Sequence, residues 1–155
     1  MHVNVNKFLE LMRWFGVPLG IFFAFFWGNS PVEQFNIFVV FVVVFIAGLT
    51  GIESLFFGKT ASKLSGYAES RAYQRQSGIN NLALAITAIF AYLVGWGLFA
   101  EAALVTALLI FLSLSSINHV YAGIKEHNKS SRGFMRPVLI IILLVVVLCF
   151  MLRVF

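Results

Sequence analysis

Five long apolar segments, separated by short polar stretches, dominate the sequence. They cover residues of about 8–27, 35–57, 79–99, 102–124 and 137–155. A helix needs about 20 mainly apolar residues to cross a bilayer, with a range of roughly 17–25. In lipid every backbone N–H and C=O group needs an internal partner, so helix is favoured even where β-branched residues abound. We therefore predict an all-α membrane protein, a single domain over residues 1–155 with five transmembrane helices.

The composition excludes the main alternatives to a membrane protein. The chain is 61% hydrophobic and 11% charged, whereas soluble domains carry roughly 25% charged residues. A water-soluble fold of 155 residues cannot hide so much apolar surface, and a disordered chain requires the opposite composition. Cys149 is the single cysteine, so the sequence provides no internal disulfide and no thiolate metal cage.

Lysine and arginine are distributed unevenly between the two ends of the predicted helices. In the five-helix arrangement ten of the eleven basic residues fall on one side, and Arg153 falls on the other. The ten are Lys7, Arg13, Lys59, Lys63, Arg71, Arg75, Lys125, Lys129, Arg132 and Arg136. The positive-inside rule then predicts a cytoplasmic N-terminus and an external C-terminus, in the plasma (inner) membrane. The same rule accounts for the net charge of +5 without nucleic acid as a partner.

The first apolar segment has a second interpretation. A basic start followed by an apolar stretch also describes a secretory signal peptide. Residues 28–31 read GNSP and offer no small-x-small cleavage site, so we expect the segment to be retained. Its removal would leave the orientation of the other four helices unchanged.

The stretch 58–78 combines basic residues with small apolar ones. Its basic residues recur at multiples of four positions, and they are Lys59, Lys63, Arg71 and Arg75. This spacing keeps them near one face of a helix. We expect one short helix, or two helices broken near Gly66, at the cytoplasmic interface, with the four side chains in contact with anionic lipid headgroups. The alternative is a solvated loop that only satisfies the orientation rule.

Polar residues gather at one depth of the predicted bundle. Successive helices run in opposite directions, so the end of the second, the start of the third and the end of the fourth share the cytoplasmic half of the membrane. The candidate site residues there are Glu53, Gln74, Asn81, Ser116 and His119. Ser116 and His119 are three positions apart and therefore share a helix face. We predict either a ligand or proton site here, or interhelical hydrogen bonds that serve packing alone.

Glu53 and His119 are the ionisable members of this cluster. A charge at the membrane centre costs about 2.5–3.5 kcal/mol on insertion scales, so Glu53 requires a proton or a cation nearby. The candidate cations are Lys59, Arg13 and a protonated His119. Because His119 can exchange a proton near neutral pH, it forms a candidate proton-sensitive pair with Glu53.

Several kinds of site lack the residues that they need. Of the three histidines only His119 lies in an apolar segment, which excludes a bis-histidine haem within the chain. One histidine and one glutamate are too few for a closed metal site of about four ligands. The sequence contains no Walker loop and no HExxH motif, nor a GxSxG elbow. It therefore predicts no metal and no catalytic residue, and it leaves the cofactor unknown.

A series of short motifs resembles one family in order and spacing. The motifs are Gly66-Tyr67, Arg71-Ala72-Tyr73-Gln74, Asn81-Leu82-Ala83-Leu84 and His119-Val120-Tyr121-Ala122-Gly123-Ile124, followed by a polar loop and Pro137. Over about residues 48–150 the chain resembles the small multi-pass membrane proteins of domain-of-unknown-function family 6790. The most specific positions of the resemblance are Gln74, Asn81 and His119, which belong to the polar cluster. The resemblance implies the fold and no activity.

Three functions are compatible with these features. We expect a binding or accessory membrane protein, not an enzyme, with a polar intramembrane pocket near the cytoplasmic face. The first alternative is a small proton-coupled transporter that uses Glu53 and His119. The second, weaker alternative is a membrane enzyme that acts on a quinone or a lipid. Besides the bilayer, a second copy of the chain or another membrane subunit is an expected partner of the phenylalanine-rich helix faces.

Overall fold

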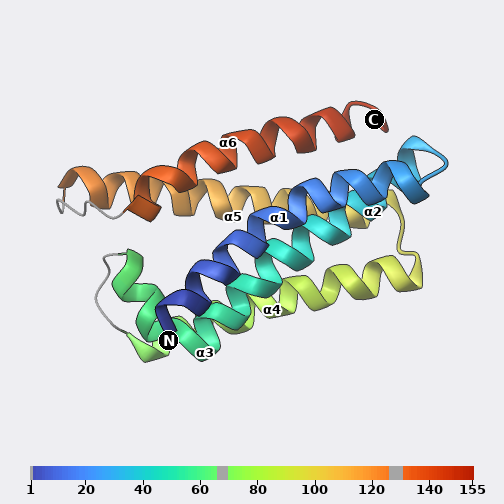
Figure 1. The fold of residues 1–155 in the computed structure, drawn as a ribbon. Helices are drawn as coiled ribbons and strands as arrows, with labels where there is room; N and C mark the ends of the chain where they lie inside the picture. Colours follow the sequence, from blue (N-terminus) through green and yellow to red (C-terminus); the bar gives the residue numbers. More distant parts are fainter. Residues whose placement is uncertain (1, 66–69, 126–130) are drawn as a thin grey trace.

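The computed structural model describes residues 2–65, 70–125 and 131–155, which form helices joined by short turns. The elements, in chain order, are α1 (His2–Trp27), α2 (Pro31–Val43), the π-helical segment η1 (Val44–Gly48), α3 (Leu49–Ser65), α4 (Arg71–Val94), α5 (Leu98–Lys125) and α6 (Ser131–Met151). Figure 1 shows these helices packed lengthwise as a bundle. The predicted all-α class is therefore confirmed for this part of the chain.

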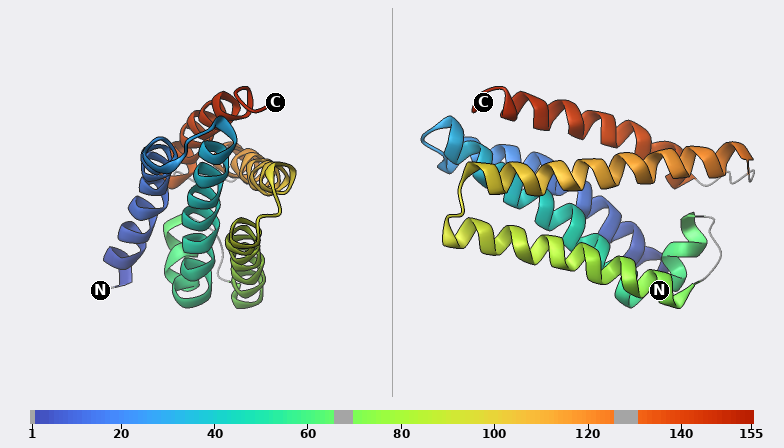
Figure 2. Two further views of the ribbon diagram at one scale, coloured as in Figure 1. Left: turned by 90° about the vertical axis from the view of Figure 1, so that its right-hand side faces the viewer. Right: turned by 180° about the vertical axis from the view of Figure 1, so that it is seen from behind.

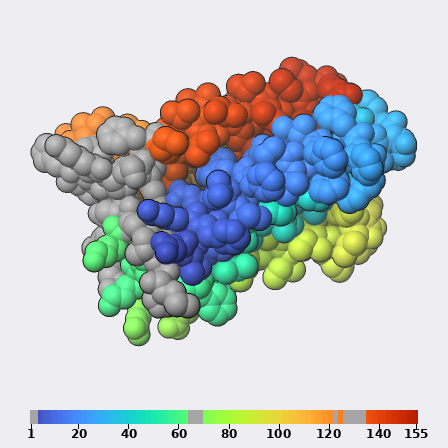
Figure 3. All heavy atoms as spheres, viewed as in Figure 1, coloured from blue at the N-terminus to red at the C-terminus, as the bar shows by residue number. Residues whose placement is uncertain are grey.

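The helices have the lengths and compositions of membrane helices. Within the described residues, four helical stretches are long and apolar enough to cross a membrane: Asn4–Trp27, Pro31–Lys63, Arg71–Val94 and Leu98–Tyr121. The apolar helix Met135–Met151, within α6, is shorter. Large apolar side chains also remain exposed along the outside of the bundle, as on the face that α1 and α6 present in Figure 3. Exposure of such surfaces to lipid costs no free energy, whereas their exposure to water is unfavourable. The membrane class is supported, and the five-helix topology stays a prediction.

The second predicted segment forms the centre of the bundle. The run α2–η1–α3 is continuous, and Figure 2 shows it between α1 on one side and α4 and α5 on the other. It begins at Ser30, whose hydroxyl accepts a hydrogen bond from the Glu33 N–H at 3.2 Å, and Pro31 takes the first helical position. Both residues favour a helix start. Several of its apolar side chains are fully buried; they include Phe35, Phe38, Val39, Val42, Val43 and Ile46.

The central run contains two irregular points. Residues Val44–Gly48 form a π-helical turn, and Phe57 has non-helical dihedrals of φ −126° and ψ 17°. One extra residue in a helical turn rotates everything after it by about 100° relative to a continuous α-helix. The π turn therefore sets which side chains of α3 face the interior.

Small residues let α3 and α4 approach each other closely. A Cβ atom added at Gly51 would lie 2.7 Å from Leu82 Cγ and 3.0 Å from the Gly78 carbonyl oxygen. On α4 the buried face consists of Gly78, Asn81, Ala85, Ala88 and Ala91. Because lipid provides no hydrophobic drive between helices, close packing of small residues is a main source of their association.

The predicted interfacial stretch 58–78 contains the end of α3 and the start of α4. It follows the irregular dihedrals at Phe57, where α3 is kinked, so residues 58–65 form a short helical piece beyond the kink, and α4 starts at Arg71. The hydroxyl of Ser70 caps α4 by accepting from the Tyr73 N–H at 3.4 Å. The break expected near Gly66 falls outside the described residues. The basic side chains thus belong to the ends of two long helices.

The two ends of the bundle have different chemical character. At one end α1 and α4 start, α3 and α5 end, and α6 starts (Figure 1). This end, which we call the basic end, carries the exposed side chains of Lys7, Lys59, Lys63, Arg71, Arg75 and Lys125. The opposite end holds the α1–α2 turn, the α4–α5 turn and the C-terminus.

Candidate functional site

An open cavity of about 150 Å³ lies towards the basic end, and we call it the polar cavity. Side chains of α1, η1, α3, α4, α5 and α6 line it. Its polar lining residues are Arg13, Thr50, Glu53, Ser54, Ser62, Tyr73, Gln74, Ser77, Ser115, Asn118, His119 and Arg136. The rest of the lining is apolar, with Trp14, Ile46, Ala61, Phe111, Leu112 and Ile140.

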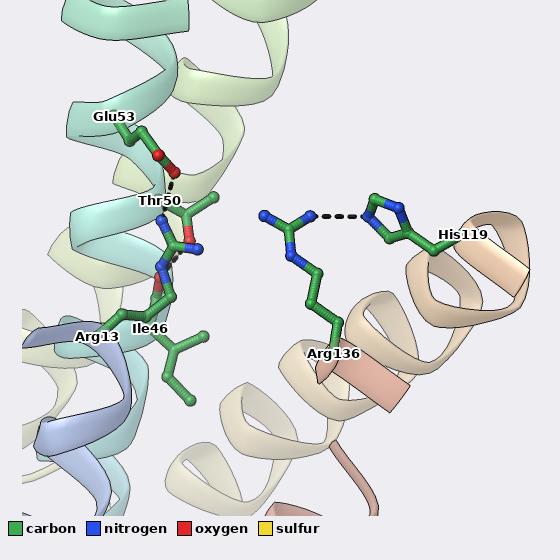
Figure 4. Close-up of polar contacts among 6 residues, drawn as sticks. All are labelled: Arg13, Ile46, Thr50, Glu53, His119 and Arg136. Atoms are coloured by element: carbon green, nitrogen blue, oxygen red, sulfur yellow. Dashed lines mark hydrogen bonds and ion pairs between the residues drawn. The ribbon is translucent and has the colours of Figure 1, made fainter. Parts of the chain in front are cut away.

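A buried ion pair forms one wall of the polar cavity. Arg13 Nη2 of α1 donates to Glu53 Oε2 of α3 at 2.6 Å, and the two side chains are only 6% and 4% exposed. Figure 4 shows them beside Thr50, whose hydroxyl donates to the Ile46 carbonyl oxygen at 2.5 Å within the π turn. Arg13 was one of the three cations expected near Glu53. Removing either partner would take the nearby opposite charge away from a buried charged group, which is costly.

Arg136 and His119 form a second polar contact across the cavity. Arg136 Nη1 of α6 lies 2.7 Å from His119 Nε2 of α5 (Figure 4). A guanidinium group has donors only, so Nε2 of His119 accepts and its ring proton lies on Nδ1. In this contact His119 is therefore a neutral imidazole.

Sequence reasoning missed this role of Arg136 and counted it only as part of a basic loop. The helical topology contained the signal that would have found it. The start of the fifth apolar segment and the end of the fourth lie at the same end of the bundle, so Arg136 and His119 share a depth.

Gln74 links α4 to the end of α3. Its Nε2 donates to the hydroxyl of buried Ser62 at 2.6 Å. Gly58 makes this approach possible, because a Cβ atom there would lie 2.9 Å from Gln74 Cβ. Glu53, Gln74 and His119 therefore all line the polar cavity, as three of the five predicted site residues.

Asn81 and Ser116, the other two predicted site residues, do not line the polar cavity. Asn81 is buried and donates through Nδ2 to the Ser77 carbonyl oxygen at 2.9 Å, one turn earlier in its own helix. Ser116 is buried elsewhere on α5, and its neighbours Ser115 and Asn118 line the cavity instead.

A second open space of about 530 Å³ lies between the ends of α3 and α4, and we call it the basic groove. Its lining residues are Ser54, Leu55, Phe56, Gly58, Lys59, Arg71, Gln74 and Arg75. It contains three of the four predicted lipid-contact residues. The fourth, Lys63, is exposed but does not line the groove.

Glu101 lies at the end of the bundle opposite to the basic end. Residues 100–101 separate the third and fourth predicted segments, whereas the structure places Glu101 in the first turn of α5 with 1% of its surface exposed. Its Oε2 atom has no hydrogen-bond partner among the residues that the structure describes. Within the same residues, no group of three or more His, Cys or Glu side chains is placed to hold a metal ion.

Comparison with known proteins shows to which family the chain, with most of the cavity lining, belongs. No curated protein and no solved structure matches the chain. The model of a family of unknown function, DUF6790, matches residues 19–155. The match includes every residue that lines the polar cavity except Arg13 and Trp14. The resemblance seen in the sequence motifs is thereby confirmed, and the chain belongs to the family of unknown function DUF6790.

Proposed function

We propose that the chain is a membrane-embedded binding or accessory protein whose binding site is the polar cavity. The observation that carries this proposal is the convergence of polar side chains from α1, α3, α4, α5 and α6 on one open cavity, at one end of an otherwise apolar bundle. Polar and ionisable groups within a membrane are costly and usually mark ligand or ion sites. The uneven distribution of basic residues supports a cytoplasmic location for this end.

The lining of the cavity supports a small polar ligand, or the polar end of an amphipathic one. Arg136, Gln74 and Tyr73 supply N–H and O–H donors, and Ser115 adds a hydroxyl that can donate or accept. Phe111, Leu112 and Ile140 provide apolar contacts beside them. Pockets with a mixed lining of this kind, apolar walls with a few placed polar groups, are typical of small-molecule sites.

Native mass spectrometry of the gently purified protein tests the proposal. We expect a discrete small-molecule adduct on the wild-type chain and its loss in a Gln74→Ala/His119→Ala variant. Ser115→Ala should weaken the adduct. The matched variant Ser116→Ala should retain it, because Ser116 is buried on the same helix but does not line the cavity. An adduct that survives in the double variant, or a bare mass for the wild type, would overturn the assignment.

Proton-coupled transport is the second candidate function. It is favoured by one observation: Glu53 and His119 both line the same open cavity, each in contact with an arginine. Proteoliposomes with an entrapped pH-sensitive dye test it against a panel of small charged solutes. Solute-dependent proton flux that disappears in Glu53→Gln would support transport. Ligand binding without solute-dependent proton flux would contradict transport and would be consistent with the binding function.

A further inference from the structure

We propose that the basic groove binds the phosphate of one anionic lipid headgroup, with the acyl chains directed along the apolar side of α3. The groove shares Ser54 and Gln74 with the polar cavity but has its own cationic lining. The inference therefore goes beyond the proposed function. It is also narrower than general attraction to an anionic membrane, because it assigns the lipid to one place between two helix ends.

The charges of the groove converge from two helices. Lys59 belongs to α3, whereas Arg71 and Arg75 lie one turn apart on α4, and all three side chains are exposed. Among the residues that the structure describes, the lining of the groove includes no carboxylate. Arginine presents a planar fork of donors that matches phosphate oxygens in a bidentate manner, and lysine adds a point charge.

The backbone shapes the groove around these charges. The irregular dihedrals at Phe57 interrupt α3 just before Gly58, and the missing side chain of Gly58 lets Gln74 of α4 approach. The groove therefore ends on a tight contact between the two helices. Arg71 is the first residue of α4, so the positive end of that helix dipole also faces this region.

The apolar part of the lining selects a lipid rather than a free anion. Phe56 is 74% exposed, and it lines the groove together with Leu55. An inorganic phosphate ion makes no use of such a wall. A phospholipid uses both parts, because its headgroup meets the cations while its acyl chains cover the aromatic ring. The groove lies at the basic end, the level at which headgroups meet the bundle.

The test is native mass spectrometry of the full chain in detergent with added phosphatidylglycerol. We expect one tightly held lipid, and an apparent affinity that falls at least about tenfold in Arg71→Gln/Arg75→Gln, since this variant removes the charge-assisted hydrogen bonds of both guanidinium groups to the phosphate. Lys59→Gln should weaken binding in the same direction. Arg71→Lys/Arg75→Lys keeps the charge but loses the bidentate geometry. Its affinity for the lipid should therefore lie between that of the wild type and that of Arg71→Gln/Arg75→Gln.

Lys63→Gln is the matched control, because it removes the same charge from the same helix outside the groove. Its affinity should stay within about twofold of wild type. Equal losses in Lys59→Gln and Lys63→Gln would mean diffuse electrostatic attraction and would overturn the site. Displacement of the lipid by millimolar inorganic phosphate would reassign the groove to a free anion. Equally tight binding of phosphatidylcholine would also contradict a site for anionic headgroups.

Discussion

Arg13 Nη2 and Glu53 Oε2 lie 2.6 Å apart in the interior of the bundle, although their residues are 40 positions apart in the sequence. The pair ties α1 to the part of α3 that follows the π turn. It also places a fixed positive and a fixed negative charge on one wall of the polar cavity. Both the stability of the bundle and the character of the cavity therefore depend on a contact between residues that are far apart in the sequence.

Removing one member of this pair should be more harmful than removing both. Arg13→Gln or Glu53→Gln alone should destabilise the protein by about 3–5 kcal/mol, because each removes the opposite charge that lies 2.6 Å from a buried charged group. The double variant should recover part of that loss. Thermal unfolding in detergent measures the difference. Lys7→Gln, which removes an exposed charge from α1, should have little effect, and similar losses for Lys7→Gln and Arg13→Gln would contradict the burial argument.

The close packing of α3 on α4 predicts different outcomes for two glycines on the central run. Gly51→Ala should destabilise the protein by about 1–3 kcal/mol, because the new Cβ would meet Leu82 and the Gly78 carbonyl oxygen at 3.0 Å or less. Gly48→Ala is the control, since its Cβ would lie 3.5 Å from Ala85 Cβ, an ordinary contact. If unfolding temperatures of the two variants agree, this helix interface is not as tight as described.

The contact between Arg136 and His119 predicts a single ring tautomer. Nitrogen NMR of protein labelled at histidine should show His119 neutral, with Nδ1 protonated and Nε2 unprotonated. The spectrum of His119→Gln identifies its signals among those of the three histidines. In Arg136→Gln the tautomer preference should weaken. A doubly protonated ring at neutral pH in the wild type would exclude the 2.7 Å contact with a guanidinium group.

The buried Glu101 predicts a stabilising substitution. Its Oε2 atom has no hydrogen-bond partner among the described residues, and burial of an unpaired carboxylate opposes folding. Glu101→Gln keeps the shape and removes the charge, so the unfolding temperature should stay equal or rise. Glu33→Gln should not stabilise, because the exposed Glu33 carboxylate accepts a hydrogen bond from the Asn29 N–H at 2.8 Å. A lower unfolding temperature for Glu101→Gln would mean that its charge is paired.

The orientation of the bundle is directly testable by cysteine labelling. In a Cys149→Ser background, Asn29→Cys places a thiol in the α1–α2 turn, and Lys63→Cys places one at the basic end. A membrane-impermeant maleimide added to intact cells should label Asn29→Cys and leave Lys63→Cys unlabelled until the membrane is opened. The reverse pattern would invert the topology and move the polar cavity to the outer face.

Hydropathy was sufficient to predict the helical class, and the order of the apolar segments predicted which polar residues share one end of the bundle. Glu53, Gln74 and His119 meet at one cavity because antiparallel helices bring their ends to a common level, which requires only the order of the segments. Glutamate within an apolar run also implied a nearby cation, and Arg13 was among the candidates.

Rotation about the helix axis could not be predicted in the same way. Ser115 lines the cavity and Ser116 does not, and a single position changes the direction of a side chain by about 100°. The π turn at Val44–Gly48 adds a further rotation to α3, and the apolar sequence of this turn gives no sign of it. Arg136 was assigned to a loop because Pro137 marked the start of the last apolar segment, whereas α6 starts at Ser131 and includes that proline.

The order of Arg13 and Glu53 in the chain has a consequence for biosynthesis. Ribosomes produce Arg13 before Glu53, so the cation is in place when the carboxylate of α3 reaches the membrane. A helix that carries a lone carboxylate enters lipid at a cost, and a waiting guanidinium group lowers that cost. We therefore expect α3 to enter the membrane at a lower cost once α1 is in place, so that the order of translation assists the assembly of the bundle.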